Sequence, residues 1–222
     1  MRTCDLHIHT SFSKDGESTV EEVLAQAARV GLDAVAITDH DTVEGARYAL
    51  SLAGPVTVIP GVEVSTRQGH LIVLGVTDPI PPGMDFVQTV AVARGMGGVL
   101  ILPHPYHQWR HGVALKVTSA ISLVDAVESF NSRYITGSAN RRAAREAYRA
   151  DKPCVGGSDA HNGRYVGFGR TLVDTDGPDA ASILAAIRAG KTRAEGHMTP
   201  LRTYTRQSLK GAVRRIKTRV RL

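Results

Sequence analysis

The sequence is poor in cysteine and in aromatic side chains, and it has no long apolar run. Its 222 residues include only two cysteines, Cys4 and Cys154, and 5% aromatic residues. Two cysteines inside apolar runs cannot form a disulfide framework and are typical of buried thiols in a reducing compartment. No stretch approaches the roughly 18 apolar residues of a transmembrane helix, and no basic and apolar leader opens the chain. We therefore expect a cytoplasmic protein.

Acidic residues are absent from the C-terminal end of the chain. Residues 202–222 carry eight of the 27 basic side chains, which leaves 19 basic against 21 acidic ones in residues 1–201. The net charge of +6 therefore divides into +8 for this segment and −2 for the rest. We predict one domain over residues 1–201 and a basic, helical tail over residues 202–222. Such a tail is typical of contact with nucleic acid or an anionic surface, and the alternative is a solvated terminal helix.

Seven apolar, β-rich runs alternate with amphipathic segments along the chain. The clearest helical segment, residues 18–31, begins at a capping Ser18 or Thr19 and ends at Gly31. Strands that are apolar on both faces and alternate with helices predict an α/β fold with a parallel sheet. Seven of them favour a closed or nearly closed barrel over an open sheet. The predicted strands are residues 4–9, 33–39, 56–64, 70–76, 98–105, 124–131 and 153–159.

Polar side chains of the kind that bind metals lie at the ends of these runs, where α/β barrels carry their functional residues. A single histidine at a strand end is most often an ordinary polar residue, as we expect for His107, His111 and His197. A core does not bury many ionisable groups without something that neutralises them, however, and a divalent metal is the usual answer. The candidates are His7, His9, Asp15, His40, Glu63, His70, His104, Glu128, Asn131, Asp159 and His161.

Imidazoles and carboxylates without a thiolate cluster favour zinc, manganese or iron over calcium or magnesium. Because one zinc ion takes about four ligands, this many candidates predict two or three ions. Sites with several neighbouring metals hydrolyse phosphate esters, so we expect a metal-bridging hydroxide that attacks phosphorus.

Five separated motifs resemble, in order, those of the polymerase and histidinol phosphatase (PHP) family. They are DLHIHTSFSKDG, AITDHDT, GVEVS, LPHP and GGSDAH, and the resemblance extends from about residue 3 to about residue 170. It implies a stand-alone metal-dependent phosphoesterase with a distorted (β/α)7 barrel and a site for three metals. The resemblance also implies how nine ligands are distributed among the three metals. The first metal would take His7, His9, Glu63 and Asp159, the second Asp15, His40 and the bridging Glu63, and the third His70, His104 and His161.

Three further residues are candidates for binding the substrate phosphate. Arg133 and Arg170 each offer a guanidinium that can bind a phosphate through two hydrogen bonds, and Asn131 lies two residues before Arg133. Arg133 is also a candidate catalytic residue, as are Asp159 and His161 for proton transfer to the leaving oxygen, with a metal-bound water as the simpler donor. The expected substrate is a nucleotide, a nucleoside bisphosphate or the 5′ end of a short oligonucleotide.

Three other functions are compatible with parts of this pattern. The first is a small-molecule phosphatase of the histidinol phosphate type. The second is an amidohydrolase-type C–N hydrolase, which also starts with two histidines in HxH spacing. That class commonly uses a carboxylated lysine on a strand, and the seven runs contain no lysine. The third is a non-catalytic nucleic-acid-binding module, which would not need all nine ligands.

Overall fold

The computed structural model describes residues 1–107, 112–134 and 136–200, so the tail predicted over residues 202–222 lies outside it. No helix in these ranges is long and apolar enough to cross a membrane. The strands are β1 (Arg2–Ile8), β2 (Ala34–Ile37), β3 (Thr57–Ser65), β4 (His70–Leu74), β5 (Val99–Leu102), β6 (Ala126–Asn131), β7 (Cys154–Gly157), β8 (Gly169–Val173) and β9 (Thr192–Gly196). The helices are α1 (Val20–Arg29), α2 (Glu44–Leu50), α3 (Phe86–Gly95), α4 (Ala120–Leu123), α5 (Gly137–Arg149) and α6 (Ala180–Arg188), with short 3₁₀ turns η1 (Val113–Leu115) and η2 (Gly163–Tyr165).

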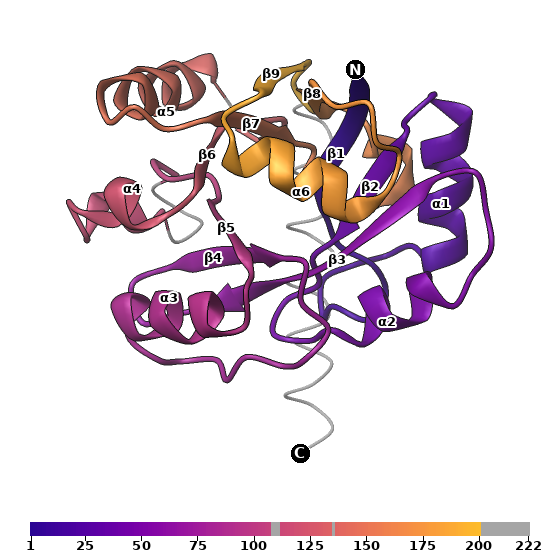
Figure 1. Cartoon of the computed structure of the whole chain (residues 1–222), viewed down its shortest axis with the longest axis horizontal. Coiled ribbons are helices and arrows are strands. Elements are labelled where there is room, and N and C mark those ends of the chain that lie inside the picture. The colour runs from indigo at the N-terminus through magenta and orange to yellow at the C-terminus, as the bar shows by residue number, and fades with distance from the viewer. Residues whose placement is uncertain (108–111, 135, 201–222) are drawn as a thin grey trace.

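The strands form one sheet in the order β7-β6-β5-β4-β3-β2-β1-β8-β9 (Figure 1). All seven predicted strands are present as β1 to β7, but the prediction of a parallel sheet is wrong at β4. This strand runs antiparallel to both β3 and β5. Only residues 66–69 join β3 to β4, and a parallel pair needs a crossover connection of a dozen or more residues. Strands β8 and β9 were not predicted, and both pair antiparallel.

The sheet curls into a nearly closed barrel around one apolar cluster. Each of β1 to β7 contributes to this cluster, as Leu6 and Val155 do from β1 and β7. Ile183 and Ile187 of α6 belong to the same cluster, and α6 contacts β3, β5 and β8, so this helix lies across one end of the barrel. Near the other end the first and last barrel strands meet just beyond β7, where the amide of His9 donates to the carbonyl of Ala160 at 2.9 Å.

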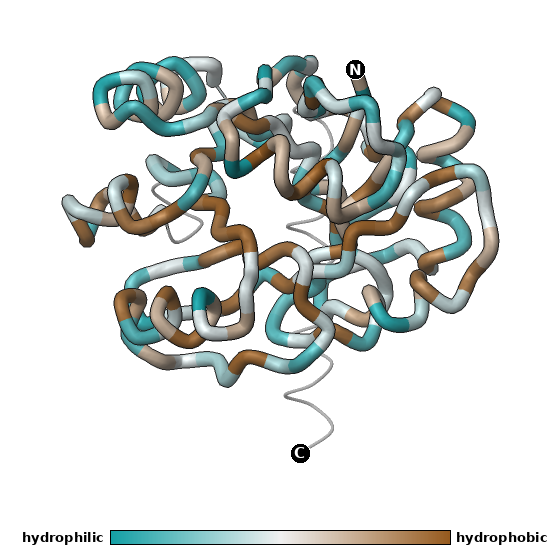
Figure 2. Tube along the Cα trace, viewed as in Figure 1, coloured by the Kyte–Doolittle hydropathy of each residue, from teal (hydrophilic) through white to brown (hydrophobic). Residues whose placement is uncertain are grey.

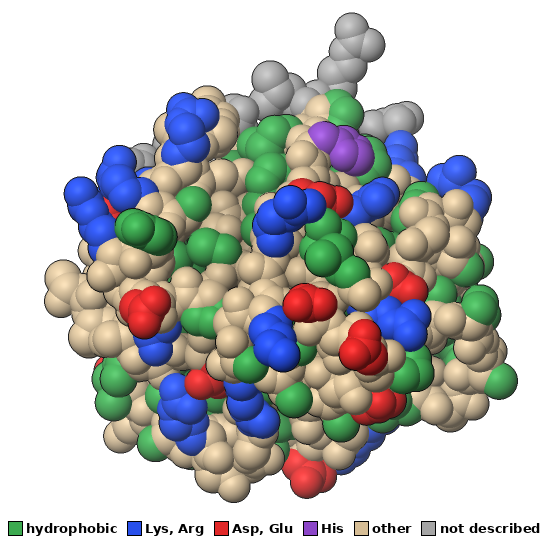
Figure 3. Space-filling model, turned by 45° about the horizontal axis from the view of Figure 1, so that its top comes forward, with side chains coloured by type: hydrophobic (Ala, Val, Ile, Leu, Met, Phe, Trp, Pro, Cys, Tyr) green, Lys and Arg blue, Asp and Glu red, His purple; other side chains and the backbone are tan. Residues whose placement is uncertain are grey.

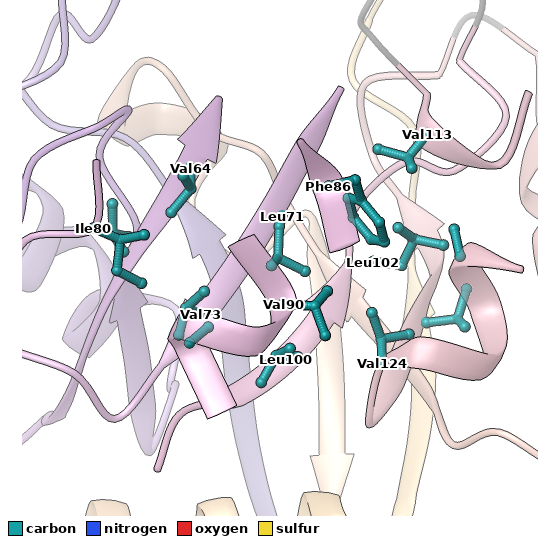
Figure 4. Packing of buried hydrophobic residues seen from close by; sticks show 14 of the residues in the cluster. Val64, Leu71, Val73, Ile80, Phe86, Val90, Leu100, Leu102, Val113 and Val124 are labelled. Atoms are coloured by element: carbon teal, nitrogen blue, oxygen red, sulfur yellow. The ribbon is translucent and has the colours of Figure 1, made fainter. Parts of the chain in front are cut away.

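Helices cover the outside of the sheet with one apolar face each. Figure 2 shows hydrophobic residues concentrated on the strands and mixed with hydrophilic ones on the helices. Phe86 and Val90 of α3 pack towards Leu71 and Leu100 of β4 and β5 (Figure 4). Phe86 is fully buried, and its burial contributes on the order of 2 kcal/mol. Asp85 caps this helix by accepting the amide of Val87.

Helix α1 begins at one of its two predicted caps. Thr19 accepts the amide of Glu22, and the Glu22 carboxylate accepts the amide of Thr19, which completes a capping box. Ser18 has another partner, because its hydroxyl accepts the amide of Gly163 at 2.9 Å. The helix start is thereby tied to the segment that follows β7.

The two cysteines are free thiols. Cys4 is buried as predicted, and burial raises the pKa of its thiol to about 12, so it is protonated and unreactive at neutral pH. Cys154 is only partly buried, in contrast to the prediction.

An irregularity in β1 aims its histidines into the barrel. The register with β2 shifts between Asp5 and Ile8. Before the shift Leu6 packs in the barrel interior, and after it Ile8 packs outside with residues of α1. His7 and His9 therefore share the inner side, as their spacing predicted, and their Nε2 atoms lie 3.1 Å apart.

Asp5 fastens β1 to the connection between β7 and β8. Its carboxylate accepts the amides of Ser158 at 2.9 Å and Gly167 at 2.8 Å, one on each oxygen. The residue is fully buried, and burial raises the pKa of its carboxyl to about 6 in spite of these hydrogen bonds.

We predict that Asp5→Asn lowers the free energy of unfolding by about 2 kcal/mol, because an asparagine can offer an acceptor to only one of the two amides. The measurement is the urea midpoint at pH 7.5, where Asp5 is ionised. Asp176→Asn, at an exposed site, is the control and should leave the midpoint unchanged. An unaltered midpoint for Asp5→Asn would contradict this account of the connection.

Candidate metal centre

All nine predicted ligands lie at one end of the barrel. Six of them follow the C-terminal end of a strand, as expected from the sequence, and His7 and Glu63 lie within β1 and β3, each near the C-terminal end of its strand. His70 is the exception, since it is the first residue of β4. Because β4 runs antiparallel to its neighbours, its beginning lies at the same end of the barrel as the ends of β3 and β5. The reversed strand therefore brings His70 to the other ligands.

Glu63, at the end of β3, is the centre of the cluster. Its Oε2 atom lies 3.1 Å from Nε2 of both His7 and His9. Its Oε1 atom lies 2.9 Å from Nδ1 of His70 and 3.0 Å from Nε2 of His104. Glu63 is 1% exposed, so a single buried carboxylate connects imidazoles from β1, β4 and the end of β5.

A second group lies beside the first, on the side towards solvent. His161 Nε2 lies 2.8 Å from Asp15 Oδ2, and His40 Nε2 lies 3.8 Å from the same oxygen. The ring centroids of His9 and His161 are 4.2 Å apart, which connects the two groups. The side chain of Asp15 is 50% exposed and that of His40 is 23% exposed, so the cluster is accessible to solvent at this second group.

The position of His161 differs from the one that the family resemblance implied. It lies with Asp15 and His40, and not in a set with His70 and His104. The reason is the strand order: the loop after β1 carries Asp15 and lies beside the segment after β7, where the amide of Glu17 donates to the carbonyl of His161 at 2.8 Å.

Within the described part of the chain, four overlapping sets of side chains have their ligand atoms within 4.8 Å of one another. Every predicted ligand belongs to at least one of them. The sets are His9, Asp15, His40 and His161; His7, His9 and Glu63; His7, His104 and Asp159; and His40, Glu63 and His70.

The charges of these groups depend on each other. Burial alone would raise the pKa of Glu63, but the neighbouring histidines His40, His7 and His70 hold it well below its usual range. Burial lowers the pKa of His7, but the carboxylates of Glu63 and Glu128 outweigh this effect and raise it well above the usual value. The pKa of His70 is likewise raised by Glu63 against the effect of burial.

His9 has the opposite electrostatic surroundings. Burial and the neighbouring His161 and His40 lower its pKa well below the usual value, so its imidazole is neutral and has a lone pair to offer. The Nδ1 atoms of His40 and His104 are buried and have no hydrogen-bond partner among the described residues. The neutral imidazole of His9, two buried ring nitrogens without hydrogen-bond partners and the ionised carboxylates of Asp15 and Glu63 are a donor set that suits zinc, manganese or iron.

The loop that carries Asp15 is fixed by Asp39, a residue that sequence reasoning did not single out. The Asp39 carboxylate accepts the amide and hydroxyl of Thr10 and the hydroxyl of Ser13. The Ser13 hydroxyl in turn accepts the amide of His40. A Cβ atom on Gly45 would lie 2.1 Å from the Asp39 carboxylate, which explains the glycine there. The only sequence signal was the position of Asp39 directly before His40.

Two ligands have a left-handed backbone, with φ of 30° at His104 and 51° at Asp159. This conformation is costly for residues other than glycine and persists only where several contacts hold it. The Glu128 carboxylate accepts the amide of His104 at 2.7 Å, and the side-chain amide of Asn131 donates to Asp159 at 3.3 Å. Glu128 and Asn131 thus support the ligands from behind.

The candidate phosphate-binding residues have different positions. Arg133 is 7% exposed, and its guanidinium lies 3.3 Å from Asp159 Oδ1 and also contacts His161 Nδ1. Arg170 lies on β8 and donates from Nε to the carbonyl of Gly167, and none of its described contacts is with a ligand. Arg133 and Asn131 are therefore part of the centre, and Arg170 is not brought to it.

Comparison with known proteins places the chain in a family. The sequence model described as "PHP domain" matches residues 5–154, and one described as "PHP-associated" matches residues 137–192. An uncharacterised protein of Methanocaldococcus jannaschii is 33% identical over 151 residues, which cover 63% of this chain and 87% of that protein.

Relatives that carry the names of enzymes include a phosphodiesterase and an exoribonuclease. The phosphoribosyl 1,2-cyclic phosphate 1,2-diphosphodiesterase of Eggerthella lenta is 41% identical over 114 residues, and the 5′-3′ exoribonuclease Rnm of Salmonella typhimurium is 36% identical over 105 residues. These matches cover 48% and 44% of this chain. They span only 40% and 36% of the two enzymes.

The fold also has a solved counterpart. It is similar to a two-domain protein of Bacteroides vulgatus that contains a predicted PHP-like metal-dependent phosphoesterase, with a TM-score of 0.75 and 20% identity. The similarity covers 88% of this chain and 65% of that one. Because the PHP model matches well over half of the sequence, the chain belongs to the PHP family of metal-dependent phosphoesterases.

Proposed function

We propose that the protein hydrolyses a phosphate ester of a nucleotide, of a nucleoside bisphosphate or at the 5′ end of a short oligonucleotide, with metal ions held by the nine-residue cluster. The observation that carries the proposal is the convergence of four imidazoles on the buried Glu63 carboxylate. Two buried ring nitrogens of this cluster, Nδ1 of His40 and Nδ1 of His104, have no hydrogen-bond partner among the described residues. Divalent cations would complete this cluster.

The geometry suggests which residues hold each ion. Asp15, His40 and His161 form the solvent-side group, and His70 and His104 share the Oε1 atom of Glu63. The third group consists of His7, His9, Asp159 and the Oε2 atom of Glu63. Such ions, when bound, lower the pKa of a coordinated water and neutralise phosphate oxygens.

The protein's own residues orient and admit the substrate. Entry is from the side of Asp15 and His40, because these ligands are partly exposed and His7, His9 and Glu63 are not. The buried guanidinium of Arg133 lies against two ligands, so we assign it to holding Asp159 and His161 in place, with any contact to phosphate as a second role.

The proposed substrate class is based on what the named relatives act on. The named relatives act on a cyclic phosphodiester and on RNA, which both present a phosphate ester to the enzyme. Small phosphomonoesters of the histidinol phosphate type remain the alternative, since the metal ligands do not distinguish between them. The residues around the centre other than the ligands must make this distinction.

The last described residues before the basic segment 202–222 lie close to the centre, and we propose that this segment binds a nucleic-acid substrate. Thr199 donates its amide to the carbonyl of Ser132 at 2.7 Å, and their hydroxyls lie 2.8 Å apart. Ser132 stands between Asn131 and Arg133, which contact Asp159. On the face shown in Figure 3, basic and acidic side chains are interspersed, whereas the sequence of residues 202–222 has eight basic residues and no acidic one.

Manganese should raise the melting temperature more at pH 8 than at pH 6. The pKa values of His7 and His70 lie above the usual 6.5, so their protons compete with the metal, and they compete more strongly at pH 6 than at pH 8. At a free concentration about 100 times Kd, bound metal adds about 2.7 kcal/mol of stability. Differential scanning calorimetry at both pH values measures the shift. Equal shifts would contradict the predicted proton release.

Full-length, manganese-loaded protein should release mononucleotides stepwise from a short 5′-phosphorylated RNA. We expect His40→Ala to lower this rate on the order of 100-fold, because it removes a ligand of the exposed group, and Asp176→Asn to leave it unchanged. A mononucleotide and histidinol phosphate are tested in parallel. Hydrolysis of histidinol phosphate alone would favour a small-molecule phosphatase, and hydrolysis of none of the three substrates would contradict the proposed function.

Replacing the eight basic residues of 202–222 by glutamine should lower kcat/KM for the RNA at least tenfold at low salt. Because the glutamines no longer neutralise phosphates, kcat/KM for the RNA should also depend less steeply on salt concentration. The rate on a mononucleotide should stay the same, since it offers no chain for the tail to bind. Equal losses on both substrates, or on neither, would show that the tail does not bind the nucleic acid.

A further inference from the structure

Glu128 is a buried carboxylate that belongs to none of the four ligand sets. It lies in β6, is 1% exposed, and its Oε1 atom is 2.9 Å from Nδ1 of His7. Its Oε2 atom accepts two hydrogen bonds, from the amide of His104 at 2.7 Å and from the side chain of Asn131 at 2.9 Å. The carboxylate therefore contacts groups from β1, β6 and the segment after β5.

The two ring nitrogens of His7 face different partners. Nδ1 faces Glu128, while Nε2 faces Glu63 at 3.1 Å and the Nε2 atom of His9 at 3.1 Å. Only Nε2 is directed at the ligand cluster. For His7 to bind a metal there, the proton of its neutral ring must be on Nδ1.

We infer that Glu128 is a positioning residue that keeps the proton of His7 on Nδ1 and so leaves the lone pair of Nε2 free for a metal. A carboxylate ion can only accept hydrogen bonds, so the atom 2.9 Å away must be the donor. This inference rests on the metal site proposed above. It adds a residue that acts through a ligand without being one.

The neighbours of Glu128 make a sharp prediction for the isosteric Glu128→Gln. If the glutamine oxygen faced His7, its NH₂ group would meet two donors, the amide of His104 and the side chain of Asn131. In the opposite orientation the oxygen keeps both of these hydrogen bonds, and the NH₂ group donates to Nδ1 of His7. The second orientation satisfies more groups, and it moves the ring proton of His7 to Nε2, the atom that faces the cluster.

Gly157 makes the arrangement possible. A Cβ atom at this position would lie 2.5 Å from Oε1 of Glu128 and 2.5 Å from Cβ of His7. Any side chain on β7 here would separate the carboxylate from the imidazole. The glycine therefore fits a structure in which these two side chains must touch.

The experiment uses full-length protein labelled with ¹⁵N-histidine. Two-bond ¹H–¹⁵N spectra of the metal-free form, at a pH where His7 is neutral, report which nitrogen carries the proton, and His7→Asn identifies the signals. We expect the proton on Nδ1 in the wild type and on Nε2 in Glu128→Gln. Zinc affinity, measured by competition with a chromophoric chelator, should fall 10- to 100-fold in the variant. Glu44→Gln, an exposed position with the same loss of charge, should change neither quantity.

Each outcome has a separate meaning. A wild-type proton on Nε2 overturns the inference whether or not the variant folds, and so does a Glu128→Gln protein that keeps both the proton on Nδ1 and the zinc affinity. A merely structural role would lower stability and leave the tautomer as it is. If the wild type binds no zinc or manganese, the proposed function fails, and the position of the proton still decides the role of Glu128.

Discussion

The buried carboxylate of Glu63 is the interaction on which this end of the barrel depends. An ionised carboxylate pays a large desolvation penalty unless charged or hydrogen-bonding partners surround it. Here the partners are imidazoles from separate segments, foremost those of His40, His7 and His70, which depress the pKa of Glu63 against the effect of burial. The histidines need the carboxylate in the same way, because His7 and His70 keep raised pKa values only beside it. The cluster is therefore a coupled unit, and divalent cations are the partners that we propose for it.

Several irregularities of the fold serve this cluster. The register shift in β1 turns His7 and His9 inward, and the reversed direction of β4 brings His70 to the same end as Glu63. The strained backbones of His104 and Asp159 are held by two hydrogen bonds: Glu128 accepts the amide of His104, and the side chain of Asn131 donates to Asp159. A regular parallel barrel would supply none of these positions without other changes. The distortions are thus a consequence of where the ligands have to be.

Much of this arrangement could be predicted from the sequence. Strands β1 to β7 were predictable because most of their residues are apolar, and the ligands were predictable because polar residues at the ends of apolar runs are unusual. Strands β8 and β9 were missed because they alternate buried with part-exposed residues or are mostly polar. An apolar run does not encode the direction of its strand, so the reversal of β4 could not be seen.

Contacts between distant segments were the harder part. The spacing of Asp159 and His161 predicts a shared face, but the partners of His161 depend on β7 lying beside β1. Glu128 was recognisable as a polar residue at a strand end. Its contact with Nδ1 of His7 depends on Gly157 having no side chain, and no local sequence pattern reveals this contact.

The central claim is that the cluster around Glu63 is a metal site. The most direct measurement is a crystal structure of manganese-soaked protein with anomalous diffraction recorded on both sides of the manganese absorption edge. The account predicts anomalous peaks within coordination distance of Glu63 and of the Asp15, His40 and His161 group. Clear density for these side chains with no peak among them, or with manganese bound only elsewhere, would contradict it.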